Sequence, residues 1–195
     1  MSAPSTDALN IAVILGSTRP GRQSSTIAHW VLATASRRPD ADFTVVDLAD
    51  HDLPMLDEPV AAAMSRDYQH AHTRTWSRTI DSYDGFVFVT PEYNHSTTGA
   101  LKNALDYLYP EWHDKAAGFV GYGTHGGTRA VEQLRLVMGE LHVADVRSQV
   151  ALSLFTDFPD GHLAPAEHHE AALKATLDQV VRWADALAPL RRGAR

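Results

Sequence analysis

The sequence has 195 residues, of which 44% are hydrophobic and 21% charged, as is typical of one globular domain with a substantial core. Its net charge of -7 argues against nucleic acid as the main partner, because a nucleic-acid-binding face is basic. No apolar run reaches the roughly 18 residues that span a membrane, and the absence of cysteine excludes disulfides, thiolate metal sites and thiol nucleophiles. We expect a single domain over residues 1–195 of a cytoplasmic protein, with flexible ends at 1–9 and 190–195.

In the first half of the chain, short apolar runs predict strands at residues 10–15 and 43–48. Between them, helical spacing places four apolar side chains on one face, those of Ile27, Trp30, Val31 and Ala35. After the second strand, we interpret residues 61–80 as another helix from a less even stripe, formed by Met64, Tyr68, Ala71 and Trp76.

In the second half, runs rich in valine and phenylalanine predict strands at residues 85–90, 117–122 and 147–152. The next two helices carry apolar stripes of Leu101, Ala104, Leu105 and Leu108, and of Val131, Leu134, Met138 and Leu141. The last helix carries Leu173, Leu177, Val180, Val181 and Ala184.

Alternation of strands and helices predicts an α/β fold with a five-stranded parallel sheet and helices on both faces, because parallel strands need long crossovers. Five such units match the known doubly wound order 2-1-3-4-5. In that order, ligands bind beyond the carboxyl ends of the strands. The loops that leave the first, third and fourth strands should therefore meet at one edge of the sheet.

The first of these loops, GSTRPGRQSS at residues 16–25, has the composition of a phosphate-binding loop. Gly16 allows a sharp turn, Ser17, Ser24 and Ser25 offer hydroxyl groups, and Arg19 and Arg22 carry forked donors that match phosphate oxygens. Free backbone N–H groups at the following helix start would add to them. The patterns of a nucleoside-triphosphatase loop and of the dinucleotide fingerprint are both absent. A capped helix start with surface arginines explains the same residues without a ligand.

The other two loops are TPEYNHSTTGA at residues 90–100 and GYGTHGGTR at residues 121–129. The first offers a flat ring and amide groups beside a helix start; the second has four glycines within seven residues, which lets backbone approach a ligand. An ordinary βα turn and a flexible loop are the alternatives. The run DLPMLDEP at residues 52–59 either lines a substrate pocket or covers the sheet edge.

Three segments, GSTRPGR, PEYNHSTTGALKNALDYL and GYGTHGGTRAVEQLR, resemble the NADPH-dependent FMN reductase family of flavodoxin-like proteins. The resemblance spans roughly residues 10–152. It implies non-covalently bound FMN, NADPH or NADH as hydride donor, and a homodimer or homotetramer with the flavin near the subunit interface.

The resemblance also implies the cofactor contacts, which we list as Ser17, Arg19, Arg22, Gln23, Ser24, Ser25, Pro91, Glu92, Tyr93, Asn94, Gly123, Thr124, His125 and Gly126. In one common version of the phosphate loop, G-S-x-R-x-x-S-x-N, the later serine and asparagine fall at Arg22 and Ser24, so Gln23 and Ser25 are candidate substitutes. The proline-to-asparagine segment would lie beside the isoalloxazine ring and the glycine loop near its pyrimidine side.

The function that follows is transfer of hydride through FMN to a flavin, quinone, azo compound or similar small acceptor. Because the cofactor carries this chemistry, we assign no catalytic acid or base, and Glu92 is interpreted as structural. The eleven histidines lack metal-site spacing, so we expect no metal, and we expect neither nucleic acid nor membrane as a partner. An FMN-binding electron carrier or redox sensor, and a flavin-free binder of a phosphorylated metabolite, are the alternatives.

Overall fold

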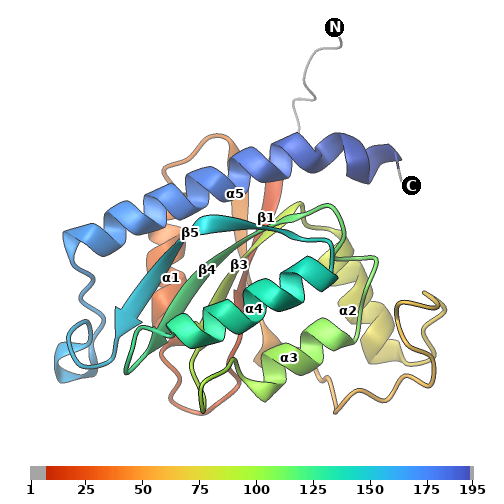
Figure 1. The fold of residues 1–195 in the computed structure, drawn as a ribbon, viewed down its shortest axis with the longest axis horizontal. Helices are drawn as coiled ribbons and strands as arrows, with labels where there is room; N and C mark the ends of the chain where they lie inside the picture. The colour runs from red at the N-terminus through yellow and green to blue at the C-terminus, as the bar shows by residue number, and fades with distance from the viewer. Residues whose placement is uncertain (1–7, 194–195) are drawn as a thin grey trace, which may run out of the picture.

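A computed structural model describes residues 8–193 of the chain, and its centre is one parallel sheet (Figure 1). The strands are β1 (Leu9–Leu15), β2 (Ala41–Asp47), β3 (Gly85–Pro91), β4 (Ala116–Gly123) and β5 (Ala144–Ser153). They pair in the order β2-β1-β3-β4-β5, and every pair is parallel. The predicted fold class and strand order are confirmed.

Helices cover both faces of the sheet (Figure 1). They are α1 (Ser24–Ala35), α2 (Ala71–Asp81), α3 (Gly99–Asp106), α4 (Thr128–Glu140) and α5 (Glu167–Gly193), with short 3-10 turns η1 (Leu48–Asp50) and η2 (Pro159–Gly161). One core forms between the sheet and α1 and α5, and the other forms against α2, α3 and α4. Within residues 8–193, no helix is both long and apolar enough to cross a membrane.

The two cores follow from the alternation of side chains along each strand. In β1, Ile11 and Val13 face the first core, whereas Ala12 and Ile14 face the second. Both faces are therefore covered, which is why β1, β3 and β4 appear in the sequence as nearly continuous apolar runs. The parallel arrangement brings the carboxyl ends of all five strands to one edge.

The predicted helix over residues 61–80 was wrong in its first half, because only α2 is helical and residues 61–70 form a loop. Tertiary hydrogen bonds hold this loop. Glu58 accepts a hydrogen bond from the backbone N–H of His70 at 3.0 Å, and the buried hydroxyl of Tyr68 donates to Glu111 at 3.0 Å. These contacts outweigh the weak helical pattern, since an apolar residue at helical spacing can equally anchor a loop.

The chain ends are ordered further out than we predicted. Leu9 already lies in β1, and α5 continues through residues 190–193. Arg191 in its last turn donates to the carboxylate of Asp84 at 2.7 Å, which fixes the end of the helix against the sheet. The rest of the ends expected to be flexible, residues 1–7 and 194–195, lies outside the described residues.

Candidate functional site

The three unusual loops meet at the carboxyl edge of the sheet around a cavity of about 110 Å³. Seven predicted contacts line it: Arg19, Arg22, Gln23, Pro91, Glu92, Tyr93 and Gly123. Seven others lie near it without lining it: Ser17, Ser24, Ser25, Asn94, Thr124, His125 and Gly126. Gly21, Tyr122 and Leu154 complete the lining and were not predicted.

Hydrogen bonds tie the first loop to the second. The backbone N–H of Gly16 donates to Val89 at 2.9 Å, and the hydroxyl of Thr98 donates to the Gly16 carbonyl. A Cβ at Gly16 would lie 2.8 Å from Leu101 Cδ2, and the φ angle of Gly16 is not positive. The glycine is therefore required by the close packing of α3, and a positive φ angle is not the reason for it.

The first loop presents buried polar atoms without partners. Ser24 Oγ and Arg22 Nε are buried and make no hydrogen bond within the described residues. Helix α1 begins here without a hydrogen bond from its N-cap side chain, that of Gln23. The other end of the Arg22 guanidinium pairs with Asp47 at the end of β2, which holds it beside the loop. Unsatisfied donors at a helix start fit a phosphate group.

Arg19 differs from Arg22 in its environment. It is exposed, and no carboxylate within residues 8–193 lies within ion-pair distance of it. Its backbone N–H approaches the buried Ser17 Oγ at 3.4 Å, and that oxygen also shares a hydrogen bond with the Tyr93 hydroxyl at 3.3 Å. Arg19 thus has its full charge available to an anion in the pocket.

The second loop makes a tight turn that projects Tyr93 beside the cavity. Tyr93 and Ser96 exchange backbone hydrogen bonds at 2.9 and 3.1 Å. The two residues between them, Asn94 and His95, have φ angles of 49° and 75°. Two positive φ angles in succession are the signature of a type I′ turn, in which asparagine is favoured. The Tyr93 side chain remains 38% exposed, so its ring is open to a ligand.

Glu92 connects the second loop to the third. Its buried carboxylate pairs with the Arg129 guanidinium and accepts the Arg129 backbone N–H at 3.1 Å, in the first turn of α4. Gly127, the N-cap residue of α4, provides no side-chain cap, and Glu92 takes that place. These contacts give Glu92 a positioning role between two site loops.

The glycines of the third loop pack mainly against their own loop. A Cβ at Gly121 would lie 2.7 Å from the Gly126 carbonyl oxygen, and one at Gly127 would lie 2.5 Å from the Tyr122 nitrogen. Gly123 is the most open, with 3.4 Å to Glu92, and it lines the cavity. The N–H of Gly126 is already bonded to the Gly123 carbonyl at 3.2 Å.

The two unpredicted side chains beside the cavity, those of Tyr122 and Leu154, lie at the carboxyl ends of strands. Tyr122 is the last aromatic residue of β4, and burial raises its pKa to about 12, so its hydroxyl stays protonated. Leu154 follows β5, and its N–H donates to the Gly123 carbonyl at 2.9 Å. The rule that ligands bind beyond the carboxyl ends also covers the loop after β5 and could have indicated Leu154.

The run at residues 52–59 contributes no residue to this cavity. It packs against α3 instead, since the Pro54 carbonyl accepts from Asn103 at 2.6 Å and from the Tyr107 hydroxyl at 3.1 Å. Of the two interpretations, the structure favours a segment that covers the edge. Among residues 8–193, no group of three histidine, aspartate or glutamate side chains is placed to share a metal ion.

Comparison with known proteins adds family and fold. Residues 9–157 match the profile of the family described as NADPH-dependent FMN reductase. The chain is 45% identical over 148 residues to an NAD(P)H-dependent FMN reductase of Schizosaccharomyces pombe, which covers 75% of this chain and 74% of the relative. It is 30% identical over 189 residues to a quinone reductase of Pseudomonas putida, covering 89% and 94% of the two chains. A solved flavoenzyme NAD(P)H:(acceptor) oxidoreductase of Paracoccus denitrificans shares the fold, with a TM-score of 0.71, 22% identity and coverage of 92% and 98%.

Proposed function

This chain belongs to the NADPH-dependent FMN reductase family, and from that membership we propose that it holds FMN across the three loops at the carboxyl edge of the sheet. It is an oxidoreductase that uses FMN and NAD(P)H. FMN held at this site would supply the transfer of hydride from NAD(P)H to an acceptor, and the protein would supply binding, orientation and electrostatics. The observation that carries the proposal is the cavity between these loops, which lies beside unsatisfied phosphate donors.

The phosphate end of the site belongs to the first loop. Arg19 supplies an unpaired charge, the Ser24 hydroxyl lacks a partner within residues 8–193, and α1 begins without a side-chain cap on its first turn. Arg22 Nε adds a further donor, although Asp47 already balances its charge. Gln23 lines the pocket and donates to the Gly161 carbonyl at 3.3 Å, so it holds the loop as well as facing the ligand. Ser25 serves through its backbone at the start of α1.

The ring end of the site lies between the second and third loops. Tyr93 and Pro91 border one side, and Gly123 borders the other with room for a flat ring. The backbone N–H groups of Thr124 and His125 have no acceptor within the described residues, unlike that of Gly126. We therefore assign the stabilisation of negative charge on the ring to Thr124 and His125.

A quinone is the acceptor class that we favour. The 30% identical relative of Pseudomonas putida is named a quinone reductase, and the exposed Tyr93 ring and Leu154 form a flat, partly apolar wall beside the cavity. We further propose a single-domain, cytoplasmic enzyme that assembles as a homodimer or homotetramer. The experiment below compares NADH with NADPH as the hydride donor.

The test begins with the absorption spectrum of the purified protein and an FMN titration followed by quenching of flavin fluorescence. We expect saturation near one flavin per chain, and then rapid bleaching of the flavin by NADH or NADPH in a stopped-flow instrument. Steady-state oxidation of the nicotinamide with a quinone should follow. Binding without turnover would instead support an electron carrier, and a protein that ignores FMN would contradict the proposed site.

A further inference from the structure

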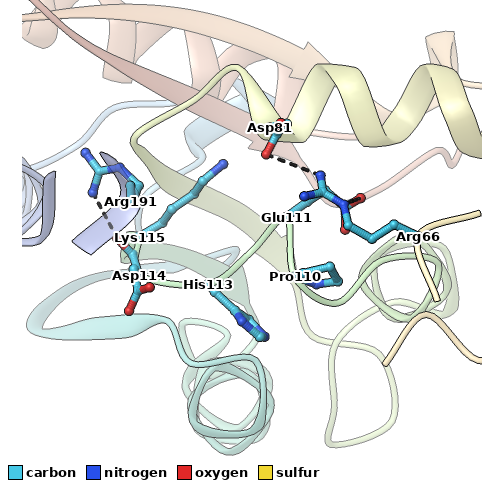
Figure 2. Close-up of a pocket in the computed structure, with 8 residues that line it drawn as sticks. All are labelled: Arg66, Asp81, Pro110, Glu111, His113, Asp114, Lys115 and Arg191. Carbon is cyan, nitrogen blue, oxygen red and sulfur yellow. Dashed lines mark hydrogen bonds and ion pairs between the residues drawn. The ribbon is translucent and has the colours of Figure 1, made fainter. Parts of the chain in front are cut away.

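A second cavity lies at the opposite edge of the sheet, where the strands begin (Figure 2). Its volume is about 160 Å³, and it shares no residue with the cavity at the carboxyl edge. Lys115 immediately precedes β4, Asp81 ends α2, and Arg191 lies in the last turn of α5. Side chains that lie far apart in the sequence thus surround this second cavity, which is separate from the proposed flavin site.

Lys115 is the unusual member of this group. The residue is 4% exposed, and its Nζ donates to the carbonyl of Ile80 at 2.7 Å. No carboxylate of residues 8–193 lies within 4.0 Å of that nitrogen, and the centroid of the Phe86 ring is 5.6 Å away. Burial lowers the pKa of Lys115 to about 7, and the more distant carboxylates of Asp81, Asp84 and Glu111 offset this effect only in part. A neutral amine satisfies the Ile80 carbonyl and keeps a lone pair free for chemistry.

The charged groups around the amine are mostly acidic. They comprise four carboxylates and two guanidiniums, those of Asp81, Asp84, Glu111, Asp114, Arg66 and Arg191. Arg66 pairs with Glu111 at 3.3 Å and with Asp81 at 3.6 Å, and Arg191 pairs with Asp84 at 2.7 Å. With Lys115 neutral, the acids outnumber the cations. The cavity therefore disfavours an anion and admits a neutral molecule.

The remaining titratable group, His113, does not compete for this role. Its ring stacks on His142 with 4.5 Å between ring centroids, and Figure 2 shows it directed away from Lys115. Burial and the neighbouring His142 lower the pKa of His113, so it adds no charge at neutral pH. The lysine side chain, in contrast, extends between Arg191 and the group formed by Arg66, Asp81 and Glu111 (Figure 2).

We propose that Lys115 is a covalent binding site for small neutral aldehydes, which it holds as a protonated imine. The Nζ lone pair attacks the carbonyl carbon, and the C=O π electrons move to the oxygen. That oxygen takes one proton from the nitrogen and one from solvent and leaves as water, while a C=N bond forms. No oxidant or reductant is needed. The remaining N–H of the iminium keeps the hydrogen bond to Ile80, and the carboxylates of Asp81, Asp84 and Glu111 offset part of the cost of its buried charge.

The volume of the cavity limits the size of the aldehyde that can reach Lys115. A volume of 160 Å³ corresponds to about five molecules of liquid water. An aldehyde of two to four carbon atoms fits such a space, whereas a sugar phosphate is excluded by its charge and its size. The guanidinium groups of Arg66 and Arg191 provide donors for a hydroxyl group on the ligand.

The experiment uses the complete protein and its three lysines, Lys102, Lys115 and Lys174. The protein is incubated at pH 7 with propanal and sodium cyanoborohydride, which reduces an imine to a stable secondary amine, and the modified peptides are quantified by mass spectrometry. Lys102 and Lys174 are exposed and serve as internal controls. We expect Lys115 to be modified at least tenfold faster than either. Its rate should level off above pH 8, whereas the control rates keep rising.

Two further measurements make the result specific to the fold. In denatured protein, the three lysines should react at similar rates. The variant Lys115→Met should lose the fast adduct, and the matched variant Lys102→Met should keep it. If Lys115→Met does not fold, the comparison among lysines in the wild-type protein decides. Modification of Lys115 no faster than that of the exposed lysines, or equally fast in denatured protein, would overturn the proposal.

Discussion

Burial of Lys115 makes the stability of the fold depend on pH between 7 and 10. Folding lowers the pKa of this lysine from 10.5 to about 7. Between these two values the unfolded chain binds a proton that the folded chain does not, so the free energy of unfolding rises with pH. For this one group, the rise from pH 7 to pH 9 amounts to roughly 2 kcal/mol. In a chain of this size, that corresponds to about 4 to 8 °C in melting temperature.

The assay is chemical unfolding at pH 7, 8 and 9 of the wild-type protein and the variant Lys115→Met. Methionine fills similar volume without a charge, but it removes the hydrogen bond from Lys115 to the Ile80 carbonyl, which keeps its backbone donor from Tyr83 at 3.2 Å, so its absolute stability will differ. The decisive quantity is therefore the difference between the two pH slopes. The control, Lys102→Met, removes an exposed lysine that pairs with Asp106 and should leave the wild-type slope unchanged. Equal slopes for wild type and Lys115→Met would mean that Lys115 is charged in the folded protein and would refute the reasoning.

Three other substitutions test the site loops. Ser24→Ala removes a buried hydroxyl without a partner, so it should not destabilise the free protein but should weaken FMN binding about fivefold to tenfold in a fluorescence titration. Glu92→Gln breaks the pair with Arg129 and should cost about 1 to 3 kcal/mol in chemical unfolding, while stopped-flow hydride transfer changes less than tenfold. Gly127→Ala places a Cβ 2.5 Å from a backbone nitrogen at a φ of 69°, and should lower stability by more than about 2 kcal/mol in the same assay.

The sheet could be predicted from the sequence because its buried strands leave a recognisable pattern over a few consecutive residues. Burial on both faces requires runs such as the FVFV of β3, and few other structures produce such runs in alternation with helical stripes. The loop at residues 61–70 could not be predicted in the same way. Its shape depends on Glu58 and Glu111, whose contacts with it cross the chain and leave no periodic signal.

The candidate site was predictable in its location and less so in its detail. Carboxyl ends of parallel strands converge whatever their sequence, so three unusual loops at those ends were enough to indicate a pocket. The composition of the loops did not reveal which of their residues pack against the protein itself and which border the cavity. Gly16 and Gly121 serve packing between backbone and side chains of the protein itself, and Glu92 caps a helix. Only a three-dimensional arrangement separates such positions from Gly123, which borders the cavity.

At the amino edge of the sheet, the burial of Lys115 affects both the stability of the fold and the reactivity of its amine. The Ile80 carbonyl at the end of α2 accepts from the backbone N–H of Tyr83, and Lys115 reaches it from just before β4 as a further donor. An amine can donate this hydrogen bond in its neutral or its charged form, but only the neutral form avoids the cost of a buried charge. The fold therefore raises the fraction of the neutral form at and above pH 7, and this is the form that is nucleophilic. A contact that serves helix capping thus leaves a reactive nitrogen facing a cavity, which is why stability measurements and aldehyde modification examine the same property of Lys115.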